Sequence, residues 1–184
     1  MMRLFIALAL PATVRAELAA TQIRLHGHPV RWADPVGLHL TLQFLGEAAE
    51  TLVPPLLSAL AAIPTEPFSL TLGGVGRFPN LGQPRTIWVG LGGDTTALSR
   101  LYEAVITATA PFGFAPDVRG FKPHLTLGRA RQGAAAAQLD ALGEALTHVA
   151  PPAPLVWVAD RPVLFASSLT PQGVVYTRLG GGGF

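Results

Sequence analysis

The tetrapeptide His-Leu-Thr-Leu occurs twice in this sequence, at residues 39–42 and at residues 124–127. In each copy polar and apolar residues alternate, and an extended strand directs alternate side chains to opposite faces. Each copy is therefore predicted to be a strand that presents an imidazole and a hydroxyl on one face and buries both leucines behind it. The copies lie 124 − 39 = 85 residues apart, which suits two halves of one domain.

Two imidazoles that face a shared cleft are suited to paired general acid and general base catalysis. Their unperturbed pKa of about 6.5 leaves both the neutral and the protonated form accessible at neutral pH. One histidine of the pair His39 and His124 can accept a proton from water while the other protonates a leaving oxygen. The hydroxyls of Thr41 and Thr126 can donate hydrogen bonds to phosphate oxygens as charge develops there. Such a reaction requires no metal or cofactor, and the residues alone leave open which histidine is the acid.

The residues around the two motifs resemble a known family. The chain is similar to the two-histidine (2H) phosphoesterase superfamily and, within it, to the bacterial and archaeal RNA 2′,3′-cyclic phosphodiesterases, once described as 2′-5′ RNA ligases. The similarity covers almost the whole chain. Besides the two motifs and their flanks, the matching residues are Met2–Ala7, Arg31-Trp32, Phe78-Pro79-Asn80, Pro84-Arg85, Trp88, Leu169-Thr170, Gly173 and Tyr176.

This resemblance implies an activity, a bilobal fold and a role for each histidine. The family's reaction opens a terminal 2′,3′-cyclic phosphate on RNA to a 2′-phosphate. By family resemblance His39 would be the proton donor to the leaving 3′ oxygen, and His124 the proton acceptor that activates water. Two alternatives stay open: reversible 2′-5′ joining of RNA ends, and an RNA-end binding module with little turnover. The implied partners are RNA ends or short oligonucleotides that carry the cyclic phosphate, with no obligate protein partner.

Four further residues are candidates for substrate binding. Lys122 lies two residues before His124 and would share its face, so it can attract a phosphate. Arg129 lies five residues after His124, on the opposite face under strict alternation, and would reach a phosphate from the end of the strand. Two equal alternatives are that Arg129 is solvent-exposed or structural and that Lys122 is a lysine at the rim with no role. Trp32 and Phe121 are candidates to stack on a base.

A second histidine pair, His26-Gly27-His28, raises a metal-binding alternative. A His-x-His pair can ligate a metal when a third ligand approaches, and Asp34 lies nearby in the sequence. No other paired carboxylate or histidine completes a ligand set, so a solvated loop is the preferred interpretation and no metal site is predicted.

Composition limits the classes of protein to be considered. The chain has 184 residues, of which 49% are hydrophobic and 13% charged, as expected for one folded domain or two small lobes. The net charge is +2 and Lys122 is the only lysine, which favours a short or terminal nucleic-acid substrate over a long duplex. The absence of cysteine excludes disulfides, thiolate metal sites and a cysteine nucleophile. No phosphate-binding loop or nucleophile elbow is present.

The first ten residues superficially resemble a secretory signal, because Arg3 precedes a short apolar run. Arg15, however, stands close to where a small-residue cleavage site should lie, so a buried first strand is the preferred interpretation. No apolar stretch approaches the roughly 20 residues that a membrane span needs. We therefore expect a cytoplasmic protein without a membrane segment.

The elements that must position the two motifs follow from hydrophobic periodicity and from glycine and proline punctuation. Residues 73–76 are expected to form a flexible turn, Phe44 to lie in the core and Tyr176 to have a structural role. Strands are predicted at 3–10, 39–45, 68–73, 86–91, 122–129, and around 155–165 and 174–179. Helices are predicted at 13–25, at 48–63 with a break at Pro54-Pro55, at 95–110 and at 134–149.

This order of elements predicts an α+β fold with an internal duplication. Strand-helix-strand-helix-strand occurs twice, with one strand added at the end. We expect residues 1–184 to form a single bilobal phosphoesterase domain, with repeats of roughly 1–75 and 85–179 and a loose glycine tail at 180–184. The two lobes are expected to be related by a pseudo-twofold axis, with antiparallel sheets lining a central cleft and helices outside.

Overall fold

The computed structural model describes residues 1–159, 161–171 and 173–181. The helices are α1 (Ala12–Arg24), α2 (Val53–Ala61), α3 (Thr95–Thr109) and α4 (Ala136–His148). The strands are β1 (Met2–Ala9), β2 (Val30–Trp32), β3 (His39–Ala48), β4 (Phe68–Phe78), β5 (Thr86–Gly93), β6 (Leu125–Ala130), β7 (Val156–Ala159), β8 (Val163–Thr170) and β9 (Gly173–Gly181).

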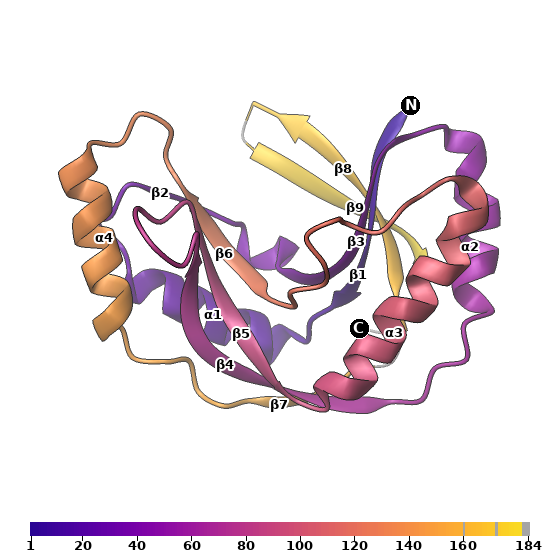
Figure 1. Ribbon diagram of the computed structural model, residues 1–184, viewed down its shortest axis with the longest axis horizontal. Coiled ribbons are helices and arrows are strands. Elements are labelled where there is room, and N and C mark those ends of the chain that lie inside the picture. Colours follow the sequence, from indigo (N-terminus) through magenta and orange to yellow (C-terminus); the bar gives the residue numbers. More distant parts are fainter. Residues whose placement is uncertain (160, 172, 182–184) are drawn as a thin grey trace.

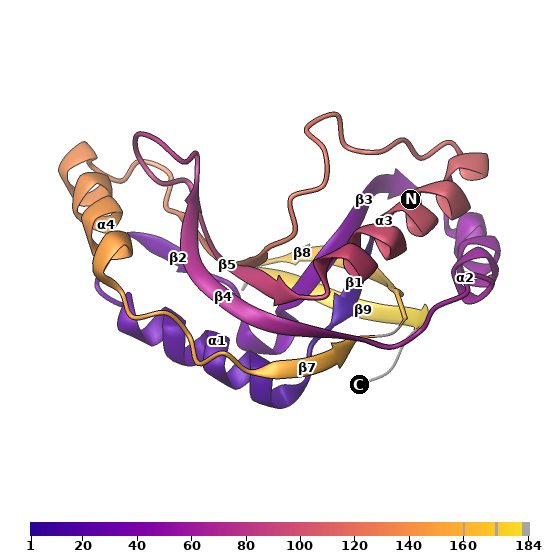
Figure 2. The same ribbon diagram turned by 60° about the horizontal axis from the view of Figure 1, so that its bottom comes forward.

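Two antiparallel sheets with helices on their outer sides confirm the predicted α+β bilobal architecture (Figure 1). The first sheet has the strand order β3-β1-β8-β9, and the second has the order β2-β6-β5-β4-β7. In Figure 1, α2 and α3 flank the first sheet and α4 flanks the second, while Figure 2 shows α1 running along the second sheet. None of the helices in the described part of the chain has the length and apolar character that a membrane crossing requires.

Each motif strand belongs to a different sheet and buries its leucines, as the alternation predicts. Leu40 of β3 and Leu125 of β6 are completely buried, and the second leucines, Leu42 and Leu127, are at most 4% exposed. Burial of each leucine side chain contributes roughly 2 kcal/mol to folding through its removal from water. The opposite faces of these strands are left to carry the polar motif residues.

The two sheets are tied together by crossed connections. Helix α1 follows β1 of the first sheet but contacts β6 of the second, and α3 follows β5 of the second sheet but contacts β3 of the first. Strand β2, from the first third of the chain, pairs with β6, while β8 and β9, from the last third, complete the first sheet. The motif strands β3 and β6 also contact one another, so the two histidine motifs lie where the lobes meet.

Strand β3 contains a β-bulge three residues after its histidine. Thr41 and Gln43 face consecutive residues of β1, so Leu42 is an extra residue between them. An extra residue reverses the alternation of side chains beyond it. Phe44 consequently lies on the His39 face and is 67% exposed, so the expectation that it lies in the core is wrong.

Strand β6 contains the same irregularity at the same place. Thr126 and Gly128 face consecutive residues of β5, which leaves Leu127 as the extra residue. The reversed alternation carries Arg129 to the face of His124 and exposes it, contrary to the strict alternation assumed from the sequence. Arg129 therefore reaches this face as a regular strand residue.

Buried amides stabilise both bulges. The carbonyl oxygen of Leu127 accepts hydrogen bonds from Gln22 Nε2 of α1 at 2.9 Å and from the backbone N–H of Ala33 at 2.8 Å. Gln22 also donates to the carbonyl of Ala33 at 2.8 Å. In the other lobe, Gln43 of the β3 bulge accepts a hydrogen bond from Thr109 Oγ1 of α3 at 2.8 Å. Each bulge is thus held by the helix that crosses to it from the other sheet.

Several element boundaries differ from the sequence-based expectations. Strand β4 continues to Phe78, so residues 73–76 are part of a strand and not a flexible turn. Glycine is required there because Gly76 lies against the Trp88 ring, where a Cβ atom would come within 2.2 Å of a ring carbon. Gly180 and Gly181 end β9 and are not a loose tail, and residues 182–184 lie outside the described part.

Three further differences concern the ends of elements. Strand β2 has only three residues and was not anticipated, because so short a segment carries no measurable periodicity. The proline pair at 54–55 lies in the first turn of α2, where missing backbone donors are tolerated, so the predicted interruption marks a helix start. Strand β6 begins at Leu125, so His124 and Lys122 precede it instead of lying within it.

Replacing Gln22 by alanine tests the importance of the buried amide. The change removes two hydrogen bonds and leaves the Ala33 carbonyl without this donor, so the free energy of unfolding should fall by about 1–3 kcal/mol. Denaturant unfolding measures this loss, and the exposed Gln132→Ala variant is the matched control, expected to unfold like the parent protein. Equal stability of the two variants would contradict the assigned role of Gln22.

Candidate active site

His39 stands at the start of β3 in a largely aromatic environment. Its ring lies 4.7 Å from the Phe5 ring, 5.0 Å from the Tyr176 ring in an edge-on arrangement, and 6.1 Å from the Phe165 ring. Its Nδ1 atom lies 2.7 Å from the carbonyl oxygen of Gly37. Strands β1, β8 and β9 of the first sheet therefore combine to hold one imidazole.

His124 stands immediately before β6 and has a corresponding environment in the second sheet. The Phe78 ring meets it edge-on at 5.1 Å, and the Trp88 ring lies 6.3 Å away. Its Nδ1 atom lies 2.6 Å from the carbonyl oxygen of Lys122. Each histidine is thus bonded to the backbone carbonyl two residues before it.

These two hydrogen bonds define the tautomer of each imidazole. A carbonyl oxygen only accepts hydrogen bonds, so Nδ1 of His39 and Nδ1 of His124 each carry a proton and donate it. The other ring nitrogen, Nε2, is then the atom that exchanges a proton with a ligand. Both rings can act as either acid or base without changing their orientation.

Burial lowers the pKa of both imidazoles below the usual value. For His39 the loss of hydration disfavours the charged form, and the bond to the Gly37 carbonyl offsets part of this effect. For His124 burial is again the largest cause that lowers the pKa, and the positive charge of Arg129 lowers it further. Both rings therefore favour the neutral form at pH 7 until an anion binds beside them.

The threonines of the motifs are available for a ligand. Thr41 and Thr126 are half-buried on the histidine faces of their strands. Neither hydroxyl has a hydrogen-bond partner among residues 1–159, 161–171 and 173–181. Each motif therefore presents one imidazole and one free hydroxyl, as the sequence predicts.

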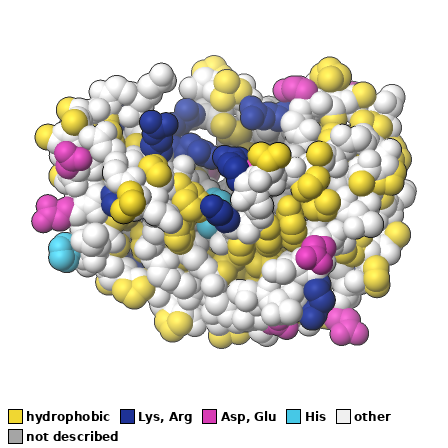
Figure 3. All heavy atoms as spheres, in the orientation of Figure 1, with side chains coloured by type: hydrophobic (Ala, Val, Ile, Leu, Met, Phe, Trp, Pro, Cys, Tyr) yellow, Lys and Arg dark blue, Asp and Glu magenta, His cyan; other side chains and the backbone are white. Residues whose placement is uncertain are grey.

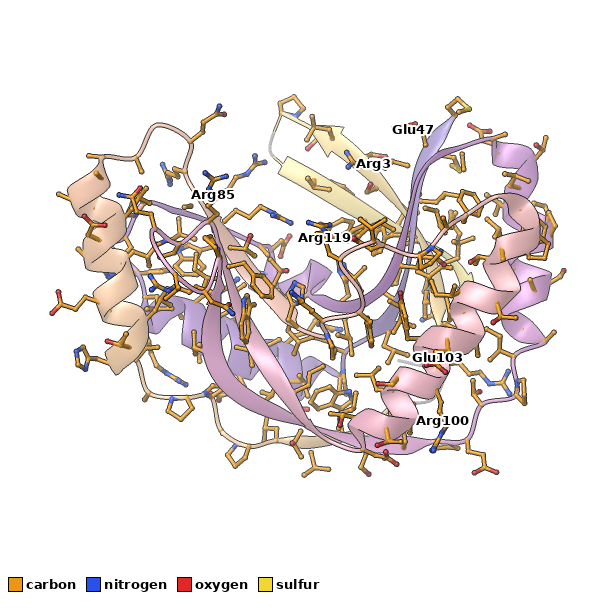
Figure 4. The ribbon with its side chains drawn as sticks, viewed as in Figure 1. Arg3, Glu47, Arg85, Arg100, Glu103 and Arg119 are labelled. Carbon is orange, nitrogen blue, oxygen red and sulfur yellow. The ribbon has the colours of Figure 1, made fainter. Side chains whose placement is uncertain are left out.

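Positive side chains surround this region. In Figure 3, Lys and Arg side chains gather around a hollow on the face seen in Figure 1, with histidine atoms visible nearby. Arg129 faces Arg31 across the β2–β6 pair. Figure 4 shows Arg119 near the centre of the view and Arg85 farther out, on the side of β5 and β6. Arg119 is neutralised by an ion pair with Asp117 at 2.5 Å. The cleft is thus cationic, as an anionic ligand requires.

The other sequence candidates have different surroundings. Lys122 is exposed and contributes its backbone carbonyl to His124. Phe121 is half-buried with its ring stacked on the Tyr102 ring of α3 at 4.2 Å, so one ring face is occupied. Trp32 is half-buried in β2 opposite Gly128 of the motif strand.

Sequence reasoning missed the aromatic contacts of the histidines. Phe5 and Phe165 were not considered, and Tyr176, expected to be structural, lies against the His39 ring. The Tyr176 ring also lies beside Gly37, where a Cβ atom would come within 2.9 Å of it. The pairing of β1, β8 and β9 brings these rings together, and no local sequence pattern indicates that pairing.

His26 and His28 are the residues for which the sequence raises a metal-binding alternative. His26 is exposed with its ring 6.3 Å from the Trp32 ring, and Asp34 caps the turn that follows it by accepting from the Val36 N–H at 3.0 Å. In the part of the chain that the structure describes, no three His, Cys, Asp or Glu side chains gather as a metal would require.

Two imidazoles, each with a neighbouring hydroxyl, on two sheets that meet at a cationic cleft define the two-histidine phosphoesterase class. Comparison with known proteins identifies the family. The chain belongs to the 2′-5′ RNA ligase superfamily, whose family model matches residues 10–165.

Curated relatives and solved structures agree with this assignment. An RNA 2′,3′-cyclic phosphodiesterase of Aeropyrum pernix is 34% identical over 172 residues, covering 91% of this chain and 91% of the relative. One from Thermus thermophilus is 35% identical over 190 residues, covering 97% and 88%. A crystal structure of a Thermus thermophilus protein superposes with a TM-score of 0.81 at 33% identity, covering 98% and 96%. The crystal structure of E. coli LigT complexed with 3′-AMP gives 0.79 at 27% identity, covering 98% and 97%.

NMR titration of the imidazoles tests the electrostatics of the site. Because burial lowers the pKa of both His39 and His124, each ring should remain neutral until the pH falls below about 6.5. Replacing Arg129 by glutamine removes a positive charge near His124, so the pKa of His124 should rise while that of His39 stays constant. Titration of either ring above pH 6.5 in the parent protein would contradict the described burial.

Replacing Gly76 by alanine tests the support beneath His124. A Cβ atom there would overlap the Trp88 ring, which must move away from its place beside His124. The free energy of unfolding should fall by about 1–3 kcal/mol, and the NMR signals of the His124 ring should shift. Gly74→Ala is the matched control, because no atom lies within 4 Å of the added Cβ. An unchanged His124 signal in Gly76→Ala would contradict this packing.

Proposed function

We propose that this protein hydrolyses 2′,3′-cyclic phosphate ends of RNA to 2′-phosphomonoesters by paired-histidine acid–base catalysis without a metal. The observation that carries the proposal is the matched geometry of the two imidazoles, each with Nδ1 bonded to a backbone carbonyl and Nε2 left for a ligand. The activity of the relatives named above supports the same substrate.

The proposed reaction transfers two protons in one displacement. A water oxygen attacks the phosphorus while His124 Nε2 accepts a proton from that water. The bond from phosphorus to the 3′ oxygen breaks, and His39 Nε2 donates its proton to this oxygen, so the phosphate stays on the 2′ oxygen. Thr41 and Thr126 donate hydrogen bonds to the phosphate oxygens, whose charge increases in the transition state.

The electrostatics of the site are consistent with these roles. A lowered pKa keeps His124 neutral, as a base must be, and the charge of Arg129 favours that form. His39 must instead be protonated, and the negative charge of a phosphate bound in its buried environment favours the protonated ring. Substrate binding therefore prepares the acid, while the base is ready in the free protein.

The same site accommodates the alternative of 2′-5′ joining. A 5′-hydroxyl of a second RNA would take the place of water, lose its proton to His124 and leave a 2′-5′ phosphodiester. No described contact distinguishes a 5′-hydroxyl from water as the nucleophile, so hydrolysis is favoured by the concentration of water alone.

The proposal extends to other candidate residues and to the organisation of the chain. Lys122 and Arg129 would attract the phosphate, and Trp32 and Phe121 would contact a base.

A single bilobal domain with repeats of roughly 1–75 and 85–179 is supported by the matched bulges of β3 and β6. A cytoplasmic location is supported by the pairing of β1 on both sides, which makes the apolar N-terminal stretch part of a sheet.

Product analysis tests the proposed reaction. A short RNA ending in a 2′,3′-cyclic phosphate is incubated with the protein in excess EDTA, and the expected product carries a 2′-phosphate. His39→Ala and His124→Ala should each reduce turnover by ~10²-fold or more, because each removes one proton-transfer partner. Thr41→Ala and Thr126→Ala should have smaller effects, since proton transfer is retained.

The outcomes separate the alternatives. Near-normal turnover in either histidine variant would refute the paired mechanism. Binding of the RNA without turnover, unchanged in His39→Ala, would favour the binding module. Activity that EDTA abolishes and a divalent cation restores would refute metal independence and direct attention to His26 and His28.

A further inference from the structure

We propose that Arg85 and Arg131, beside Arg129, form a second anion subsite that binds an internal phosphodiester of the RNA, so that oligoribonucleotides are preferred over nucleoside 2′,3′-cyclic phosphates. This inference rests on the proposed function for the cyclic end. It adds a binding site for the part of the strand that precedes that end.

The three arginines line one pocket at the far end of the motif strand. The pocket has a volume of about 820 Å³ and lies where the start of β5, the end of β6 and α4 meet, with Pro84 and Leu139 in its wall. Arg85 precedes β5 and Arg131 follows β6, while Arg129 is the last but one residue of β6. The pocket is large enough for a phosphate and parts of the adjoining nucleotides.

The positive charges of this pocket are not neutralised by the protein. Among the described residues no carboxylate lies within 4.0 Å of the guanidinium groups of Arg85, Arg129 or Arg131. Arg129 in addition faces Arg31 directly across the β2–β6 pair, and like charges in opposed strand positions destabilise a sheet. A bound anion would remove this repulsion.

The guanidinium groups of Arg129 and Arg131 are oriented but retain free donors. Arg129 Nη1 donates to Thr86 Oγ1 at 3.2 Å, and Arg131 Nε donates to the Val30 carbonyl at 3.5 Å. An arginine has five N–H donors, so most of them remain available to a phosphate, which an arginine can bind through two parallel hydrogen bonds.

The subsite is continuous with the histidine site. Arg129 lines the pocket and also lies close enough to His124 for its charge to lower the pKa of that ring. Arg131 lies two residues farther from His124, so the pocket extends away from the imidazoles along the strand. A nucleoside 2′,3′-cyclic phosphate held at the histidines has no second phosphate to place there, whereas an oligonucleotide has one.

Arg85→Gln and Arg131→Gln test the subsite without touching the catalytic histidines. The backbone atoms of both residues keep their hydrogen bonds in these variants: Arg85 bonds to Phe78 and Ala130, and Arg131 bonds to Pro29. Arg131→Gln loses only the long side-chain bond from Nε to the Val30 carbonyl. Arg100→Gln is the matched control, because it removes the same charge from the exposed surface of α3, away from Arg85 (Figure 4).

The measurement is kcat/KM for two substrates, a hexaribonucleotide ending in a 2′,3′-cyclic phosphate and a nucleoside 2′,3′-cyclic phosphate. Each subsite variant should lower kcat/KM for the hexanucleotide roughly tenfold, the usual effect of losing a hydrogen bond to a charged group, and leave the mononucleotide unchanged. Arg100→Gln should change neither value. Equal effects on both substrates, or none on the hexanucleotide, would overturn the subsite.

A binding measurement keeps this test separate from the proposed function. A 5′-labelled hexanucleotide with a 3′-phosphate is titrated by fluorescence anisotropy at several salt concentrations. Each subsite variant should reduce the slope of log affinity against log salt by about 0.7, as one lost phosphate contact on a single strand does. An unchanged slope would refute the subsite even if the protein is active, and a reduced slope would support it even if hydrolysis fails.

Discussion

The reversal of side-chain alternation three residues after each histidine is the constraint on which the cleft depends. Without the extra residues Leu42 and Leu127, Phe44 and Arg129 would turn into the core, and neither would reach the histidine side. A bulge interrupts the ladder and exposes backbone groups that need partners. Helix α1 supplies such a partner, because Gln22 donates to the carbonyl oxygen of Leu127, and Thr109 of α3 donates to the side chain of Gln43 in the other bulge.

The two lobes present the same histidine geometry but different surroundings. At the position five residues after the histidine, one lobe carries Phe44 and the other carries Arg129. The first lobe adds the rings of Phe5 and Tyr176 around His39, while the second adds arginines beyond His124. The surroundings of His39 are therefore aromatic, while those of His124 combine the rings of Phe78 and Trp88 with the arginines beyond them.

Much of the fold and the central site could be predicted from the sequence, because repeated alternation reports which faces are buried. The motif strands, the α+β class and the shared face of each His-Thr pair are of this kind. The positions of Phe44 and Arg129 could not be predicted, since an extra residue in a strand has no compositional signature and reverses the side chains that directly follow it. Gly76 was assigned to a turn because its partner, the Trp88 ring, belongs to the next strand. The contact of Tyr176 with His39 likewise depends on pairing between distant segments.

The pairing of β1 with β8 has a consequence for how the protein is made. β1 and β8 are neighbours in the first sheet, yet 163 − 9 = 154 positions separate the end of β1 from the start of β8, so β1 is synthesised long before this neighbour. Contacts between such distant segments form late, because a long loop must close, at a cost in conformational entropy, before these contacts can stabilise the fold. Phe165 and Tyr176, which enclose His39, come from these last strands. A growing chain that already contains both histidine motifs therefore has an incomplete site, and the surroundings of His39 are complete only once β8 and β9 have formed.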